Sequence, residues 1–158
     1  MKFIYSFLLF LIVSTIHSQN IQSPSKALTL NFTLSENGKP NYTVTYKNKP
    51  IILESFLGLK LKTGIDLSSH FKVEDSKTST FNETWKPVLG EQATIVNHYN
   101  ELKVSLSQTK ANVKMNIIFR VFDDGVAFRY DFPKQKNLNY FIISDEVSDL
   151  NLAGNHKV

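Results

Sequence analysis

The chain has 158 residues, a formal net charge of +4 and no cysteine. The absence of cysteine excludes disulfides, thiolate metal sites and a cysteine nucleophile, so an apolar core must hold the fold together. The lysines are scattered through expected turns and strand exteriors, whereas a nucleic-acid-binding protein usually gathers them on one face. We therefore expect one globular domain that does not bind nucleic acid.

Residues 1–18 are expected to be a secretory signal peptide. Lys2 supplies the positive n-region, and Phe3 to Val13 form an apolar stretch that is too short to span a bilayer comfortably. A buried N-terminal strand and a membrane anchor are the alternatives, and a lipoprotein anchor is excluded because it needs a cysteine. We expect cleavage near Ser18, no membrane span, and a secreted or periplasmic mature domain over residues 19–158.

Short segments with apolar residues at every second position follow one another along the rest of the chain. Such alternation is typical of strands that bury one face, and turn residues separate the segments. No amphipathic helix stands out. The pattern predicts an all-β fold, an antiparallel β-sandwich, with a closed barrel as the alternative. The expected strands span residues 28–34, 42–46, 51–53, 57–61, 71–76, 99–107, 112–122, 126–132 and 139–144, with a less regular stretch over residues 78–96.

The clearest local prediction is a β-hairpin over Ile118–Phe132. Asp123, Asp124 and Gly125 separate two alternating runs, and glycine tolerates the positive φ that tight primed turns require. Adjacent carboxylates in such a turn face solvent or bond the turn's own backbone. A catalytic pair in a glycosidase must instead face each other across the bond that is cleaved. The aspartate pair is therefore interpreted as turn chemistry.

Two arginines of this hairpin, Arg120 and Arg129, alternate opposite to its apolar residues, with Asp131 nearby. They are expected to lie on the other face of the hairpin. A cross-strand ion pair is the simplest interpretation, and contact with another domain is the alternative.

The stretch from Asn82 to Gln92, together with residues 97–100, is the best candidate for a binding surface. It holds the only tryptophan and more polar side chains than a plain connection needs. Aromatic rings stack on sugar faces while Asn, Glu and His bond hydroxyl groups, and binding residues often lie on loops of a rigid scaffold. In the alternative interpretation, Trp85 caps the core and the polar residues stabilise a long loop. The candidate substrate-binding residues are Trp85, Glu91, Asn97, His98, Tyr99 and Asn100.

No catalytic or metal-ligating residue is predicted. The four histidines show no metal-ligand spacing, and no motif places a Gly-x-Ser-x-Gly elbow or a Ser/His/Asp set. The sequence by itself contains no self-sufficient active site.

Several short sequence segments, taken in order along the chain, together resemble one family of bacterial carbohydrate hydrolases. They lie at residues 36–46, 49–52, 57–59, 83–88, 90–91, 97–102, 117–130, 139–141 and 151–154. The chain is similar to glycoside hydrolase family 97, the retaining and inverting α-glycosidases typical of Bacteroidetes. The resemblance covers nearly the whole mature chain.

The resemblance implies a β-super-sandwich N-terminal domain, similar to galactose mutarotase, packed against a catalytic (β/α)8 barrel. In the family the barrel supplies the catalytic carboxylates, and a calcium ion is held mainly by glutamates. No catalytic or calcium-binding residue is carried over onto this chain, so calcium is expected only in the full-length enzyme. We expect the barrel to lie outside this chain and the chain alone to be inactive.

The leading hypothesis is the non-catalytic N-terminal domain of a secreted α-glucosidase-like or α-galactosidase-like hydrolase. This domain would brace the barrel and shape one wall of its sugar pocket, so its partners are the barrel and an α-linked oligosaccharide. The alternative is a free-standing carbohydrate-binding module of the cell envelope that stacks sugars on Trp85 and Tyr99. A purely structural envelope protein is the third possibility. A sandwich that rests on a barrel should also expose an apolar docking face.

Overall fold

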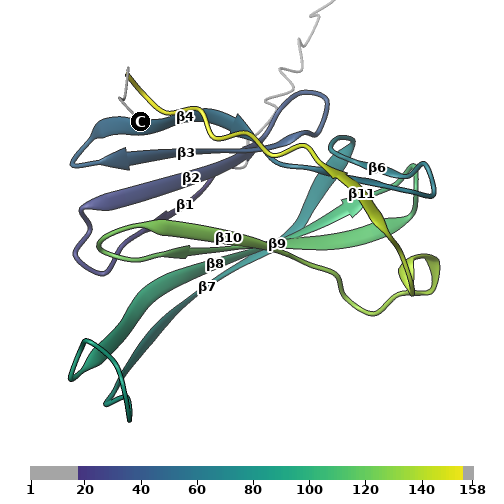
Figure 1. Ribbon diagram of the computed structural model, residues 1–158. Coiled ribbons are helices and arrows are strands. Elements are labelled where there is room, and N and C mark those ends of the chain that lie inside the picture. The colour runs from purple at the N-terminus through teal and green to yellow at the C-terminus, as the bar shows by residue number, and fades with distance from the viewer. Residues whose placement is uncertain (1–17, 155–158) are drawn as a thin grey trace, which may run out of the picture.

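The computed structural model describes residues 18–154, so nearly all of the predicted signal peptide lies outside the described residues. Figure 1 shows two antiparallel sheets stacked on one another, with a smaller third sheet at one end. Eleven strands and one short 3-10 helix make up the regular structure of this range. The prediction of an all-β antiparallel sandwich is confirmed.

The first sheet is a meander in which each strand pairs with the next one in sequence. Buried Leu28, Leu30 and Phe32 alternate with more exposed polar residues, as expected for a strand with one face in the core. The strand order is β1-β2-β3-β4, formed by β1 (Gln19–Gln22), β2 (Leu28–Leu34), β3 (Pro40–Tyr46) and β4 (Lys49–Phe56).

The C-terminal segment, residues 147–153, extends this sheet beyond β4. The Leu53 amide donates to the Asn151 carbonyl over 2.8 Å. Ile52 and Leu152 form an antiparallel bridge on the same edge. The segment therefore acts as an irregular fifth strand of the first sheet.

The second sheet has the order β10-β9-β8-β7, formed by β7 (Phe71–Trp85), β8 (Ile95–Gln108), β9 (Val113–Val121) and β10 (Val126–Asp131). β9 and β10 form the hairpin predicted from the alternation, with Val126 paired to Val121. The turn closes differently from expectation, because Gly125 does not adopt a positive φ. The Phe122 amide donates to the Gly125 carbonyl over 2.8 Å. The hairpin is confirmed, whereas the conformation assigned to its glycine is wrong.

β7 and β8 are longer than the alternation predicts. About half of the irregular stretch expected over residues 78–96 is strand, because β7 continues to Trp85 and β8 begins at Ile95. The two strands pair from Phe71 opposite Gln108 to Trp85 opposite Ile95. Most of β7 is exposed, so no buried face imposes a period of two on its sequence.

A third sheet of short strands closes one end of the sandwich (Figure 1). The strand predicted over residues 139–144 is shifted along the chain, since the 3-10 helix η1 (Lys136–Leu138) comes first and the strand begins at Ile143. Buried Leu59 and Leu67 join this sheet to the core. Its order is β11-β5-β6, formed by β5 (Leu59–Leu61), β6 (Asp66–Leu67) and β11 (Ile143–Glu146).

The core lies between the first two sheets. The Phe119 ring of β9 lies 5.8 Å from the Phe32 ring of β2 and 5.9 Å from the Tyr42 ring of β3, measured between centroids. The Tyr42 ring is also 6.0 Å from the Phe128 ring of β10. The sheets thus align β1 with β8, β2 with β9 and β3 with β10. Among the described strands, none follows β10 in the second sheet, so that sheet ends beside β4 and residues 147–153.

Candidate functional site

The outer part of the β7–β8 hairpin, residues 81–99, projects beyond the sandwich and is here named the arm (Figure 1). β9 pairs with β8 only from Asn100 onward, so the two strands of the arm have no third strand beside them in the described chain. Asn100 follows directly at the base of the arm. The other five candidate residues lie within it, namely Trp85, Glu91, Asn97, His98 and Tyr99.

The register of the arm sorts these candidates onto two faces, because directly paired residues share a face. On the first face, Trp85 is paired with Ile95, Glu83 with Asn97, and Phe81 with Tyr99. The second face carries His98 and, at the base, Asn100, since these alternate with the residues of the first. Glu91 lies in the tip loop, outside both strands. The register therefore places Trp85, Asn97 and Tyr99 on one face of the arm and separates the other three from it.

The arm exposes several apolar side chains. Trp85 is 41% exposed, and Val88 and Leu89 at the tip are almost fully exposed. Val88 and Leu89 are not among the residues predicted from the sequence to bind a ligand. Two adjacent apolar residues after Pro87, within a polar stretch, are the signal that could have found them. Exposed apolar residues gathered on a projecting element are typical of a contact surface.

Tyr99 is buried at the base of the arm. Its ring lies 5.2 Å from the Phe81 ring in a stacked arrangement and 5.1 Å from the Phe122 ring. The guanidinium of Arg120 lies 4.6 Å from the centroid of the same tyrosine ring. Nε of Arg120 also donates to the Glu101 carboxylate over 2.8 Å, which is a cross-strand ion pair of the kind expected for this arginine. This cluster anchors the first face of the arm to the sheet.

Asn100 joins the two sheets. Its side-chain amide donates to the Gln22 carbonyl over 2.8 Å. Its side-chain oxygen accepts a hydrogen bond of 2.7 Å from the Thr80 hydroxyl. Both ends of the Asn100 amide are thus engaged within the protein.

Asp123 of the hairpin turn bonds to a different turn. Its carboxylate accepts a hydrogen bond of 2.8 Å from the Ser25 amide. This bond is the main reason why the pKa of Asp123 is lower than usual, with smaller contributions from the Ser23 side chain and from nearby His98. Asp123 therefore ties the β9–β10 turn to the β1–β2 turn.

The described residues do not fit the calcium ion that the resemblance implies. Calcium needs six to eight oxygen ligands, mostly from carboxylates and carbonyls. Residues 18–154 contain no cluster of three or more His, Asp and Glu side chains that could hold a metal ion. No role of this domain is therefore derived from calcium. Within the same range, no helix is long and apolar enough to cross a membrane.

Comparison with known proteins identifies the fold. Residues 21–158 match the family described as Glycosyl-hydrolase 97 N-terminal. The chain belongs to glycoside hydrolase family 97. A family 97 enzyme from Pseudoalteromonas sp. strain K8, solved in complexes with panose and with acarbose, is 30% identical and matches 85% of this chain with a TM-score of 0.79. A β-arabinopyranosidase is 25% identical and matches 82% of it with a TM-score of 0.75.

The chain spans 20% of the length of each of these solved structures. It corresponds to the N-terminal domain of family 97 enzymes, and most of the length of those enzymes lies outside the match. The family resemblance predicted from the short sequence phrases is confirmed.

Proposed function

We propose that this chain is the non-catalytic N-terminal domain of a secreted, periplasmic α-glycoside hydrolase of family 97. The domain braces a catalytic (β/α)8 barrel and forms one wall of the barrel's sugar pocket. Residues 1–18 direct export. The substrate of the whole enzyme is an α-linked oligosaccharide, either an α-glucoside or an α-galactoside, and any calcium is held outside the described domain.

The projecting arm is the observation that carries this proposal. Exposed Trp85 shares the first face with Glu83 and Asn97, which pair directly with each other. An aromatic ring beside an amide and a carboxylate is a suitable combination for holding a sugar, since apolar walls with a few polar groups fix such ligands. Val88 and Leu89 at the tip fit an apolar contact with a second domain. The related enzyme solved with panose and with acarbose supports a sugar ligand for the assembled protein.

Substitution of Trp85 tests the pocket wall. In the gene product that extends past codon 158, Trp85→Ala should lower kcat/KM on aryl α-glycosides about tenfold, because an interface aromatic contributes about 1–2 kcal/mol of binding. Most of the change should appear in KM. The matched control is Thr84→Ala, a neighbouring exposed residue on the opposite face, which should leave both constants unchanged. Equal effects of the two variants would count against the proposed wall.

The exposure of Trp85 in the isolated domain also favours a second function, that of a free-standing carbohydrate-binding module. Titration of the 158-residue chain with maltooligosaccharides separates the two. Binding at millimolar concentration or tighter that disappears in Trp85→Ala would support the module. Absence of binding, combined with turnover by the longer product, would support the bracing domain.

A further inference from the structure

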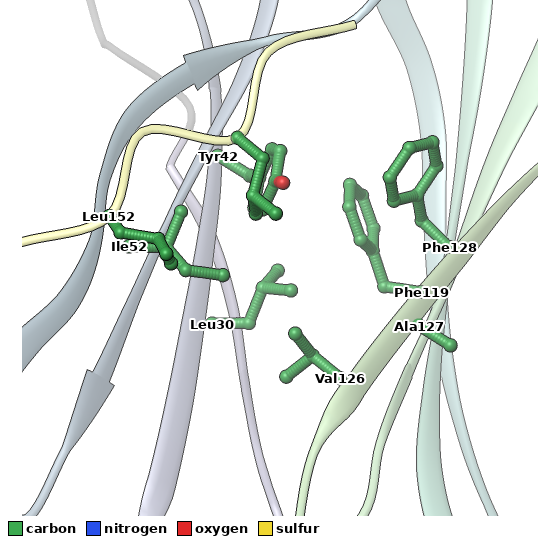
Figure 2. Close-up of a pocket in the computed structure, with 9 residues that line it drawn as sticks. Leu30, Tyr42, Ile52, Phe119, Val126, Ala127, Phe128 and Leu152 are labelled. Carbon is green, nitrogen blue, oxygen red and sulfur yellow. The ribbon is translucent and has the colours of Figure 1, made fainter. Parts of the chain in front are cut away.

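A pocket of about 480 Å³ opens between the two main sheets (Figure 2). The first sheet contributes Leu30, Tyr42 and Ile52, and the second contributes Phe119 and Phe128. In Figure 2 the side chains of the two sheets face each other across an open space. The lining is apolar and lacks the convergent polar groups that orient a small ligand. The pocket therefore resembles a part of the hydrophobic core in which packing side chains are lacking.

The pocket arises because the second sheet ends one strand earlier than the first. β10 lies opposite β3 and is the last strand of its sheet within residues 18–154. At its end the Tyr130 hydroxyl reaches Oγ of Ser148 over 2.7 Å, whereas no described strand continues the second sheet past β10 to cover β4, Leu150 and Leu152. Leu150 and Leu152 of that segment line the pocket and remain 63% and 50% exposed. The first sheet thus presents apolar side chains toward the position that a further strand beside β10 would occupy.

In the described part of the chain, β10 has no strand on its outer side, so it offers a free backbone edge beside the pocket. The bond from the Phe122 amide to the Gly125 carbonyl fixes that pair as hydrogen-bonded. In the alternating antiparallel ladder, the amides and carbonyls of Val126, Phe128 and Tyr130 then point away from β9. The side chains of the same three residues pack against the core. An exposed edge of this kind is a template for another strand.

We propose that a strand of the same polypeptide, from the part that follows residue 158, pairs with β10 and fills this pocket. The proposal rests on the proposed function in so far as the chain is the N-terminal part of a longer enzyme. The match spans only 20% of the related family 97 structures, which leaves ample chain to supply the strand. Leu152 lines the pocket and lies two residues before Gly154, the last described residue, so the polypeptide leaves the described region at the rim of the pocket.

The chemistry of the occupant follows from its surroundings. Its backbone must satisfy the free edge of β10, which requires an extended segment. Its inward side chains must cover Leu150 and Leu152, so apolar residues should recur at every second position. A strand added here would lie opposite β4 and complete the second layer of the sandwich.

Amide hydrogen exchange along β10 tests the proposal, with the 158-residue chain compared with the gene product extended past codon 158. The amides of Val126, Phe128 and Tyr130 should exchange at least about tenfold more slowly in the extended product. Ala127 and Arg129 are internal controls, because the same alternation turns their amides toward β9 in both chains. Equal rates at the three edge amides, or a reading frame that ends at codon 158, would overturn the proposal.

The same experiment distinguishes a second copy of this chain as the occupant. Protection of the edge amides that appears in the 158-residue chain and increases with its concentration would assign the edge to self-association. That result would also overturn the proposal.

Two leucine variants provide an independent test. Leu152 on the pocket face and Leu53 on the opposite face of the first sheet are 50% and 47% exposed, so Leu152→Lys and Leu53→Lys should both leave the unfolding temperature of the 158-residue chain nearly unchanged. In the extended product, Leu152→Lys should lower the unfolding temperature by at least about 3 °C, and Leu53→Lys should not. An equal effect of Leu152→Lys in the two chains would contradict an added strand. Neither measurement depends on turnover, so failure here is distinguishable from failure of the pocket wall.

Discussion

Gly38 lies in the turn between β2 and β3, where its φ is +66°. A Cβ at this position would lie 2.5 Å from the backbone oxygen of Phe71 and 2.7 Å from its backbone nitrogen. Backbone atoms cannot move aside as the end of a flexible side chain can. We expect Gly38→Ala to lower the free energy of unfolding by about 3 kcal/mol, from strain and overlap together. Denaturant titration measures this loss.

The control for Gly38→Ala is Gly125→Ala. Gly125 has no positive φ, and a Cβ there would meet no heavy atom within 4 Å. We expect this variant to change the free energy of unfolding by less than about 0.5 kcal/mol. Similar losses in the two variants would show that the contact with Phe71 is not the cause.

Tyr130 makes stability depend on pH in the alkaline range. Burial raises the pKa of its hydroxyl to about 12, and the hydroxyl lies 2.7 Å from Oγ of Ser148. Because the folded pKa exceeds the unfolded value of about 10, the tyrosine stabilises the fold fully below pH 10 and loses this effect as pH rises through 12. We expect Tyr130→Phe to lower the free energy of unfolding by about 1 kcal/mol at neutral pH.

The cost of Tyr130→Phe should shrink between pH 10 and pH 12, where the wild-type hydroxyl ionises. Denaturant titrations of both proteins across this range measure the difference in free energy of unfolding. A cost that stays constant with pH would contradict the assignment of the raised pKa to Tyr130.

Residue roles were predictable where the partner is close in sequence and obscure where it is distant. The aspartates between β9 and β10 were correctly assigned to a turn, but the bond from Asp123 to Ser25 joins segments 98 residues apart. The aromatic ring makes Tyr99 a candidate from the sequence, but the packing of that ring against Phe81 depends on strand register. Short-range patterns contain no information on such contacts.

At the scale of elements, the sequence predicts strands well where one face is buried. β2 alternates clearly, and both β2 and β9 appear close to their expected bounds, although Met115 to Phe119 of β9 are all buried. The strands of the arm are not predictable from periodicity, because their residues are largely exposed on both faces. Only the composition of this stretch distinguishes it. The segment from Phe81 to Trp85 does carry an aromatic residue at each end, an even number of positions apart, which places both rings on one face of a strand and could have indicated it.

The arm tip leads to a prediction about association. In the 158-residue chain, the double variant Val88→Ser, Leu89→Ser should change the free energy of unfolding by less than about 0.5 kcal/mol, because both side chains are exposed. The exposed apolar tip should also make the isolated chain self-associate, and the double variant should weaken this association, measured by sedimentation velocity. Tyr140→Ser, at another exposed site, is the control. An equal reduction in both variants would argue against a specific role of the tip.

At the scale of the whole molecule, the number and spacing of alternating segments predict an all-β antiparallel fold and favour a sandwich, but alternation by itself does not separate a sandwich from a closed barrel. Which strands face one another was not predictable, because the alignment of the sheets depends on contacts such as Phe32 with Phe119. The open pocket beside β10 was equally hidden, since it reflects a strand that residues 18–154 do not supply. The expectation of an apolar docking face came from the family resemblance rather than from any local pattern.

The central claim is that this domain belongs to a family 97 hydrolase without carrying out the chemistry itself. Turnover of aryl α-glucosides and aryl α-galactosides by the purified 158-residue chain, beside the gene product extended past codon 158, tests it most directly. We predict no turnover above the buffer rate for the 158-residue chain and measurable turnover for the extended product. Turnover by the 158-residue chain alone would contradict the account.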